Sequence, residues 1–369
     1  MNIFSDPTFM ENDLTRIKEK LDRGERLDAQ DGLALFSTPD LFGLGRLANA
    51  VKERLHGNRV HFGVSLNINY TNVCMLRCPI CAFSRDEGAA DAYFLAREEI
   101  VARAAAARAR GVSEVHIVGG LHRDISLAYF TQLFSRLRRI DPLLNINALT
   151  ATECDYLSRK EGMPLSDLFA RLKESGLDSM PGGGAEILDD RVRGEIAPLK
   201  IGSDRWLEVS GEAHRAGIRT NATMLWGHVE SHADRVRHML RLRELQDETK
   251  GFKAFVPLLF HPANTRLAHL KKVSSAAEIL KVYAVSRLML DNFTHVKALW
   301  MYLGLKFAGV ALRFGADDLG GTSFEERIVH AAGSEASMVS QNTLEHQIRS
   351  MGLVPCESDS NYRMIRENG

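Results

Sequence analysis

Short apolar runs, each the length of a buried strand, alternate with longer amphipathic segments from residue 64 onward. Alternation of this kind favours strand–helix units on a parallel sheet. Eight such runs fit a barrel, closed or nearly so, better than an open doubly wound sheet. We therefore expect an α/β fold with a TIM-like (β/α) barrel, although the connection from the seventh to the eighth run is short for a crossover helix. The expected strands are residues 64–73, 115–119, 145–152, 178–181, 218–225, 252–260, 296–302 and 310–315.

The segment before these runs has a different pattern. Apolar residues recur there at three and four positions between charged ones, which predicts helices over residues 13–23 and 39–55. The expected organisation is an N-terminal helical lead-in over residues 1–60, the barrel over residues 61–325, and a C-terminal helical extension over residues 326–369 that packs on the barrel.

Charge and hydropathy exclude several classes of protein. Lys and Arg number 47, as do Asp and Glu, so the chain lacks the overall basic charge typical of nucleic-acid and anionic-membrane binders. Even the apolar segment 296–312 is interrupted by Lys297 and Lys306, so a spanning helix is hard to place. Residues 1–13 lack the basic start and apolar core of a secretory signal. We expect a soluble protein of the reducing cytoplasm that binds neither nucleic acid nor membrane.

Three of the five cysteines fall within eight residues, directly after the first expected strand. Cys74, Cys78 and Cys81 have the spacing C-x3-C-x2-C. Structural zinc usually takes four protein ligands in paired motifs, and neither Cys154 nor Cys356 has a partner at such a spacing. A [4Fe-4S] cluster takes one thiolate per iron, so three cysteines leave one iron open for an exchangeable small molecule. We predict such a cluster; zinc, or cysteines that serve only packing, are the weaker alternatives.

Two glycine-rich segments lie at expected strand ends, where the chemistry of a barrel is found. Gly119 and Gly120 would let a ligand approach the backbone closely, although a pair of glycines is also typical of a simple turn. Gly182, Gly183 and Gly184 form a run that is costly in backbone entropy. Its natural use is a backbone pocket for an anion, with the free N–H groups of a following helix pointing at the ligand.

Polar side chains at the other strand ends are candidates for binding and for acid–base chemistry. Glu153 can accept hydrogen bonds from sugar hydroxyls or can cap the helix that follows. Asn221 alternates with apolar neighbours and is expected to point into the barrel. His261 and Asp318 suit acid–base work but can equally cap loops. His122 is a candidate donor to a substrate carboxylate.

The cysteine spacing on the loop after the first strand resembles that of the radical S-adenosylmethionine superfamily. The resemblance implies a barrel of the radical S-adenosylmethionine type, in which the methionine amine and carboxylate chelate the open iron. One-electron reduction then splits the sulfonium into methionine and a 5′-deoxyadenosyl radical. One departure is Ile80, which stands where the superfamily usually has an aromatic residue against the adenosine. The implied metal ligands are Cys74, Cys78 and Cys81, and the implied cofactor-binding residues are Ile80, Gly119, Gly120, Glu153, Gly182, Gly183 and Gly184.

Several segments resemble two related enzyme families of the futalosine route to menaquinone, the aminofutalosine synthases and the dehypoxanthine futalosine cyclases. Three places favour the synthases, because the cyclases tend to carry other residues where this chain has 151–153, 221–225 and 261–262. Trp226 stands where a Tyr is common in the synthases. The segments that carry the resemblance are residues 70–74, 119–122, 181–187, 245–249 and 314–318.

The synthase resemblance implies a defined reaction and defined partners. The 5′-deoxyadenosyl group of S-adenosylmethionine adds to 3-[(1-carboxyvinyl)oxy]benzoate, and rearrangement with loss of a carbon dioxide equivalent gives aminofutalosine. A reductant such as flavodoxin or ferredoxin supplies the electron. The alternatives are the cyclase, which abstracts hydrogen and releases 5′-deoxyadenosine, and a non-catalytic metal-binding scaffold. The candidate catalytic residues, chosen from their positions at expected strand ends, are His122, Glu153, Asn221, His261 and Asp318.

Overall fold

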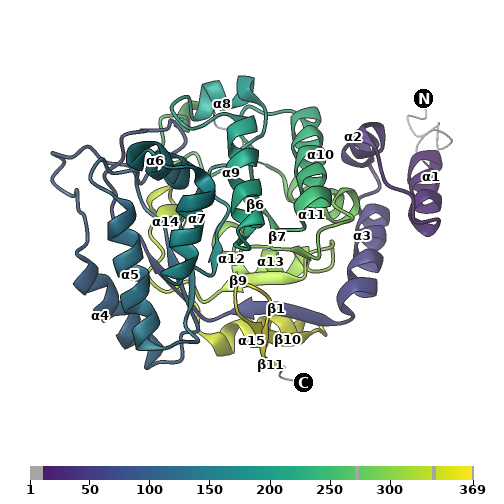
Figure 1. Ribbon diagram of the computed structural model, residues 1–369. Coiled ribbons are helices and arrows are strands. Elements are labelled where there is room, and N and C mark those ends of the chain that lie inside the picture. Colours follow the sequence, from purple (N-terminus) through teal and green to yellow (C-terminus); the bar gives the residue numbers. More distant parts are fainter. Residues whose placement is uncertain (1–10, 271–273, 335–337, 368–369) are drawn as a thin grey trace.

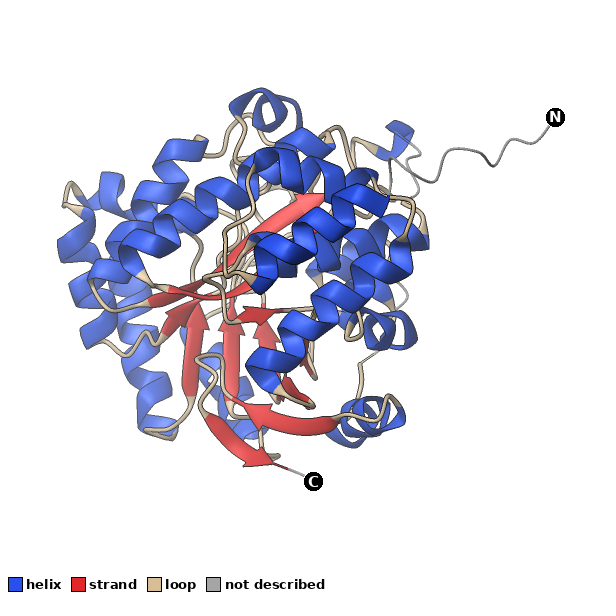
Figure 2. Ribbon diagram, turned by 90° about the vertical axis from the view of Figure 1, so that its right-hand side faces the viewer, coloured by secondary structure: helices blue, strands red, loops and turns tan. Residues whose placement is uncertain are grey.

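Seven parallel strands form a curved sheet, and helices cover its outer side (Figures 1 and 2). The computed structural model describes residues 11–270, 274–334 and 338–367. Neighbouring strands of this sheet follow one another in chain order, which is the arrangement that strand–helix units produce. The expected α/β fold with a TIM-like barrel is therefore confirmed. The strands are β2 (Ser65–Ile68), β3 (Glu114–Ile117), β4 (Asn145–Ala148), β5 (Ser179–Met180), β6 (Arg219–Trp226), β7 (Phe252–Leu259) and β8 (His295–Val296).

The helices between the strands each bury one face. In α5, Phe130, Leu133, Phe134 and Leu137 recur at helical spacing and are fully buried, while Ser126 caps the first turn. Within the described residues, no helix combines the length and the apolar character that a membrane span requires. The helices after β2 are α4 (Arg97–Arg108), α5 (Leu127–Ile140), α6 (Ala151–Glu161), α7 (Leu165–Glu174), α8 (Asp190–Ile196), α9 (Ser203–Arg215), α10 (His232–Thr249), the 3-10 turn η1 (Ala268–Leu270), α11 (Ala276–Met289), α12 (Trp300–Leu303), α13 (Leu305–Ala311), α14 (Ile328–Ala331) and α15 (Gln341–Ser350).

In the described chain from residue 11 onward, three helices precede the barrel (Figure 1). α1 (Glu11–Asp22) and α3 (Leu41–His56) lie where the sequence predicts helices, and α2 (Ala29–Ser37) lies between them. α3 packs on α11, and α2 contacts both α10 and α11. Residues 1–10 lie outside the described ranges, so the expectation about a secretory signal in residues 1–13 stays a prediction.

A second sheet closes most of the gap between the first and last strands of the barrel. Its order is β11-β10-β1-β9, with β1 parallel to both β9 and β10. Isolated parallel bridges also join β9 and the segment after it to both edges of the seven-stranded sheet. Asp318 of β9 pairs with Lys297, and Phe324, which follows β9, pairs with Leu66 of β2. The barrel is therefore nearly closed, but through single bridges and not through a continuous ladder. The strands of this sheet are β1 (Arg59–Gly63), β9 (Asp318–Gly321), β10 (Val354–Ser358) and β11 (Met364–Glu367).

The prediction of an eighth strand over residues 310–315 is wrong. These residues form the end of α13 and the turn after it, where Gly315 has a φ of 98°. Ala311 and Leu312 are fully buried, and a short apolar run does not distinguish a buried helix from a buried strand. The strand at this place is β9, which begins only after the turn. The segment 326–369, expected as a helical extension, contains strands β10 and β11 in addition to helices.

The turn between β10 and β11 covers the amino-terminal end of the barrel. The Ser360 hydroxyl donates to Asn145 Oδ1 at 2.6 Å and lies 3.0 Å from the Ser179 hydroxyl, at the first residues of β4 and β5. The Tyr362 hydroxyl donates to Asp318 at 2.7 Å, and the Tyr362 ring stacks on His295 with centroids 3.5 Å apart. The turn thus closes this end of the barrel and leaves the carboxyl ends of the strands for chemistry.

Two buried histidines around β6 predict a loss of stability in acid. His214 lies between the hydroxyls of Thr249 and Thr220, at 2.7 and 2.9 Å, and His238 Nδ1 accepts from the Leu188 N–H at 3.0 Å. Burial lowers the pKa of each histidine to about 3, while an unfolded histidine has a pKa of about 6.5. Below pH 6.5 the unfolded chain therefore binds protons that the folded chain does not.

We expect the free energy of unfolding to fall by about 1.4 kcal/mol per pH unit for each of these histidines between pH 6.5 and pH 4. Chemical denaturation at pH 7.5 and pH 5 measures this fall. The variant His238→Gln should show a shallower decline, whereas His346→Gln, which changes an exposed side chain of α15, should not. Equal slopes in the parent and in His238→Gln would contradict the assignment.

Candidate active site

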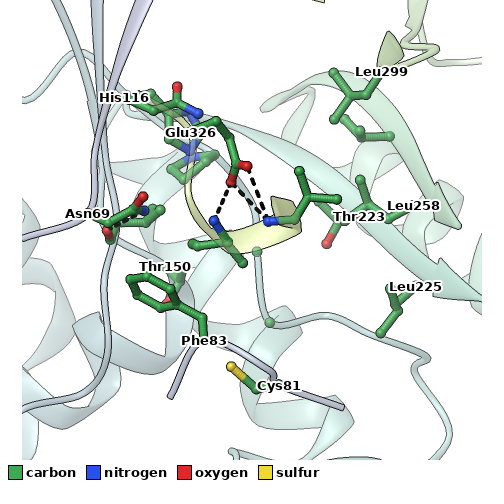
Figure 3. A pocket seen from close by; sticks show the side chains of 18 of the residues that line it. Asn69, Cys81, Phe83, His116, Thr150, Thr223, Leu225, Leu258, Leu299 and Glu326 are labelled. Atoms are coloured by element: carbon green, nitrogen blue, oxygen red, sulfur yellow. Dashed lines mark hydrogen bonds between the residues drawn. The ribbon is translucent and has the colours of Figure 1, made fainter. Parts of the chain in front are cut away.

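A cavity of about 410 Å³ occupies the interior of the barrel (Figure 3). Inward-facing side chains of the strands form its wall, and loops after the strands form its upper rim. Most of the residues predicted for the site line it, although they come from widely separated parts of the chain. These lining residues are Cys74, Cys78, Ile80, Cys81, Gly119, Gly120, Glu153, Gly183, Gly184, Asn221 and His261.

The three clustered cysteines share one loop at the rim. Its backbone is held by the Met75 N–H, which donates to Leu121 O at 3.0 Å, and by the Cys81 N–H, which donates to Cys78 O at 3.0 Å. All three cysteines have free thiols and line the same cavity. Burial raises the pKa of Cys78 to about 11, so the thiol stays protonated until a metal replaces the proton. Three thiols on one loop fit a cluster with one open iron.

Gly119 and Gly120 bring the end of β3 against the backbone that leads into the cysteine loop. A Cβ on Gly120 would lie 2.2 Å from Val73 O, and one on Gly119 would lie 2.9 Å from the Tyr70 ring. Since the protein's own atoms occupy this space, the close approach that needs glycine is between β3 and the cysteine loop. Both glycines line the cavity as well, and their contact with the methionine amine stays a prediction.

The three-glycine segment packs against β6. A Cβ on Gly182 would lie 1.9 Å from Asn221 O, and Gly182 does not line the cavity, whereas Gly183 and Gly184 do. The carbonyl of Gly182 accepts from the Thr223 hydroxyl at 2.8 Å. The expected helix N-terminus is not at this position, because α8 begins only at Asp190. The segment therefore positions β6 and the cavity wall, and the expectation of an anion at a helix N-terminus is not supported.

Glu153 caps its helix, as one of the two expectations has it, and its side chain also lines the cavity. It completes a capping box, since its Oε2 accepts from the Thr150 N–H at 2.7 Å. Its Oε1 accepts from the Tyr70 hydroxyl at 2.6 Å, and the side chain lines the cavity. Burial raises the pKa of the carboxyl, against the effect of these hydrogen bonds. Each carboxylate oxygen has a further lone pair, so Glu153 can also accept from a ligand hydroxyl.

Three polar atoms of the cavity wall have no hydrogen-bond partner in the described part of the chain. They are the Oδ1 atoms of Asn69 and Asn221 and the hydroxyl of Thr152, each nearly removed from solvent. Buried polar groups are normally paired, so such atoms indicate a ligand that supplies donors. The hydroxyl and amino groups of S-adenosylmethionine are donors of this kind. The cavity therefore fits both the cluster and the nucleoside.

The remaining predicted residues have different positions. His261 lines the cavity, lies 3.0 Å from Tyr302 O through its Nε2, and has a pKa lowered by burial. His122 lies behind the wall, where it packs on Phe94 and its Nδ1 accepts from the Asp124 N–H at 3.1 Å. Asp318 is the first residue of β9 and lies below the cavity lining, because the strand expected before it is a helix.

Two ion pairs of the site each contain a lysine that the sequence did not identify as a site residue. Lys200 Nζ lies 2.5 Å from Glu186 Oε1, and both residues line the cavity. Burial would raise the pKa of the Glu186 carboxyl, but the Lys200 ammonium holds it below its usual range. Lys297 Nζ lies 3.0 Å from Asp318 Oδ2. Lys200 belongs to the loop between α8 and α9, so no local pattern predicts its place.

The polar inner face of the barrel is a second feature that the predictions from the sequence did not include. Polar and apolar residues alternate strictly along β2, β3 and β4, so the polar set shares the inner face. His116 is one of these inward-facing residues, and burial lowers its pKa to about 4 (Figure 3). This alternation is visible in the sequence and could have identified the set. Its cavity-lining members are Ser65, Asn67, Asn69, Glu114, His116 and Asn147.

The sequence is similar to characterised families over nearly its whole length. Residues 68–242 match the radical SAM superfamily, and residues 249–368 match the CofH/MqnC C-terminal region. An aminodeoxyfutalosine synthase from Thermus thermophilus is 42% identical over 96% of this chain and 96% of its own length. One from Streptomyces coelicolor is 39% identical over 95% and 94%. A 5-amino-6-(D-ribitylamino)uracil--L-tyrosine 4-hydroxyphenyl transferase from Methanoculleus marisnigri is 38% identical over 95% and 98%.

Solved structures share the fold. The methylornithine synthase PylB aligns with a TM-score of 0.74 at 18% identity, covering 92% of this chain and 97% of its own. The hydrogenase maturase HydG aligns with a TM-score of 0.78 at 16% identity, covering 98% and 80%. At these identities the likeness supports the barrel architecture alone.

A nearly closed barrel with three thiols and unpartnered polar atoms around one cavity fits an enzyme that holds a cysteine-bound cluster beside a small-molecule site. The chain belongs to the radical S-adenosylmethionine superfamily, in the branch that includes aminodeoxyfutalosine synthases and 5-amino-6-(D-ribitylamino)uracil--L-tyrosine 4-hydroxyphenyl transferases. It is a radical S-adenosylmethionine enzyme that uses a [4Fe-4S] cluster and S-adenosylmethionine. The predicted enzyme class, barrel type and cofactors are thereby confirmed.

Proposed function

We propose that this enzyme is an aminofutalosine synthase of menaquinone biosynthesis. It joins the 5′-deoxyadenosyl group of S-adenosylmethionine to 3-[(1-carboxyvinyl)oxy]benzoate, and rearrangement with loss of carbon dioxide gives 6-amino-6-deoxyfutalosine. The observation that carries this proposal is the 42% identity, over 96% of both chains, to a relative that bears the synthase name. The local sequence features that favour a synthase over a cyclase point in the same direction.

In this proposal, the residues of the chain bind, orient and enclose the reactants. Cys74, Cys78 and Cys81 hold the cluster, which with bound S-adenosylmethionine supplies a 5′-deoxyadenosyl radical. The Glu153 carboxylate accepts from the ribose hydroxyls with the lone pairs that Tyr70 and Thr150 leave free.

Enclosure matters because a primary carbon radical abstracts hydrogen with little selectivity. The alkene must therefore be held at about 3 to 3.5 Å from the attacking carbon, in a cavity from which water is excluded. Phe83, Leu225, Leu258 and Leu299 supply apolar walls for this purpose (Figure 3). Asn221, whose backbone in β6 packs against Gly182, offers an unpartnered side-chain acceptor that can orient the nucleoside.

A second candidate reaction comes from the other relatives. Several proteins named 5-amino-6-(D-ribitylamino)uracil--L-tyrosine 4-hydroxyphenyl transferase are 35% to 38% identical over nearly the whole chain. Such an enzyme would act on tyrosine and an aminouracil in place of the enol ether. The cyclase reaction is the third possibility within the same superfamily.

Product analysis distinguishes these reactions. We expect the anaerobically reconstituted enzyme, given S-adenosylmethionine, a reductant and 3-[(1-carboxyvinyl)oxy]benzoate, to form an adenosylated aryl product and methionine in equal amounts by mass spectrometry. Parallel reactions contain tyrosine with the aminouracil, or dehypoxanthine futalosine. A reaction without reductant is the control. Turnover of tyrosine, or release of 5′-deoxyadenosine with a cyclised product, would refute the synthase assignment.

Two further parts of the proposal concern the cell. We infer a low-potential electron carrier of the flavodoxin or ferredoxin type as the reductant, because the superfamily chemistry begins with one-electron reduction. We also infer a cytoplasmic location, where thiols remain reduced and available for a cluster. Both inferences rest on the sequence and on the family.

A further inference from the structure

Lys297 lies at the floor of the cavity, opposite the cysteine loop. The cavity lining at this end includes Ser65 and Glu114, the first residues of β2 and β3, and Ser360 from the turn that covers this end. Lys297 lies close enough to Glu114 for an electrostatic interaction. The cysteines follow the carboxyl end of β2, so they line the other end of the same cavity. A ligand that reaches from the cluster to the floor therefore meets Lys297.

The Lys297 ammonium has donors to spare. Its ion-pair partner is Asp318, at 3.0 Å, and it lies 5.4 Å from the centre of the Tyr362 ring. An ammonium group has three N–H donors, so two remain for a ligand. The Lys297 side chain is 19% exposed while that of Asp318 is 3% exposed, and the exposed part of Lys297 lies in the cavity lining.

The floor has no excess of negative charge that would repel an anion. Glu114 is the second carboxylate there, and its Oε1 accepts from Asn147 Nδ2 at 3.0 Å. Lys253, whose Nζ donates to the Ser179 hydroxyl at 2.8 Å, lies close enough to Glu114 for an electrostatic interaction. Lys297 and protonated Lys253 balance Asp318 and Glu114. Burial lowers the pKa of Lys253 to about 7, and a carboxylate added at the floor favours its protonated form. The added carboxylate also gains the spare donors of Lys297.

The proposed substrate has two carboxylates, and a buried carboxylate without a donor is strongly unfavourable. Among the described residues that line the cavity, the lysines are Lys200 and Lys297, and no arginine is included. Lys200 is held by Glu186 and lies near Cys78, at the cluster end. The vinyl group must face the cluster end, so the ring carboxylate points to the floor.

We propose that Lys297 is the anchor for the ring carboxylate of the substrate, a specificity-determining contact at the floor of the barrel. The inference rests on the proposed synthase function and extends it to one binding contact. It explains why a cation with unused donors is kept inside a barrel, where burial disfavours its charge.

The test compares 3-[(1-carboxyvinyl)oxy]benzoate with 2-phenoxyacrylate, which lacks the ring carboxylate. The parent should prefer the dicarboxylate. In Lys297→Met we expect kcat/KM for the dicarboxylate to fall about 10- to 100-fold, the range of a lost charged hydrogen bond, with little change for the analogue. The KM for S-adenosylmethionine should not change, and Lys297→Arg should restore part of the preference.

Two further variants control for folding. Lys297→Met combined with Asp318→Asn removes both charges of the ion pair, so no unpaired carboxylate remains, and the same loss of preference is expected. Lys281→Met removes a partly buried lysine of α11 that donates to Phe36 O and does not line the cavity, so it should keep the parent's preference. Equal losses on both substrates in the Lys297 variants would overturn the inference alone. A parent that does not turn over the enol ether would overturn the proposed function and this inference together.

Discussion

Replacing Cys78 with alanine is expected to abolish turnover and the brown colour of the reconstituted enzyme. Cys78 is 5% exposed, shares its loop with Cys74 and Cys81, and lines the cavity beside them. Two remaining thiolates leave a [4Fe-4S] cluster with two irons that lack protein ligands, so the cluster is not retained in a defined form. Iron and sulfide analysis, the visible absorption spectrum and consumption of S-adenosylmethionine measure the loss.

The matched control is Cys154→Ala. Cys154 is fully buried, lies in α6, and does not line the cavity, so its replacement changes packing by one sulfur atom. This variant should keep the parent's iron content and turnover, with a modest fall in melting temperature. A Cys78→Ala enzyme that retains a full cluster and active turnover would show that the cysteine loop is not the cluster site.

The main strands could be predicted because each one carries a local signal. Seven of the eight expected runs coincide with or overlap β2 to β8, since each strand carries buried apolar residues in a short segment between helices. The expected barrel follows from this alternation. The second sheet could not be predicted in the same way, because β1, β9 and β10 come from distant parts of the chain and pair only in the folded molecule.

The residues of the site also differ in this respect: some are identified by their spacing in the sequence, and others are brought together only by the fold. Cys74, Cys78 and Cys81 are close in sequence, so their spacing alone indicates their chemistry. Lys200 and Glu186 lie on separate loops, and only the fold brings the two side chains together at the cavity wall. Local spacing therefore predicts the metal ligands, while the charges that surround the ligand depend on tertiary contacts.

Asp318 illustrates how one wrong element displaces a predicted residue. Its assignment to the mouth of the barrel depended on a strand over residues 310–315, and that segment is helix and turn. Asp318 instead begins β9 at the opposite end of the barrel, where it holds Lys297 and accepts from Tyr362. Its structural position supports a role in orienting Lys297 and not in acid–base chemistry.

Replacing Gly182 with alanine is expected to destabilise the protein and to disrupt the cavity wall. The new Cβ would lie 1.9 Å from the carbonyl oxygen of Asn221 and 2.5 Å from its carbonyl carbon. These are backbone atoms of β6, so no side-chain rotation relieves the overlap. Gly182 also has a φ of 74°, in the left-handed region of backbone conformation, where a residue with a Cβ is strained. Together these effects predict a loss of about 3 kcal/mol or more in the free energy of unfolding.

The variant Gly24→Ala separates strain from overlap. Gly24 has a φ of 72°, almost the same as Gly182, but a Cβ there would meet nothing within 4 Å. The free energy of unfolding of Gly24→Ala should therefore fall only by the contribution of backbone strain, about 1 kcal/mol. Denaturant unfolding of both variants gives the difference, which isolates the contact with β6. Because that contact displaces Asn221, activity per folded molecule should also fall in Gly182→Ala and stay unchanged in Gly24→Ala. Equal losses of stability in the two variants would show that the glycine segment serves only as a turn and does not position the cavity wall.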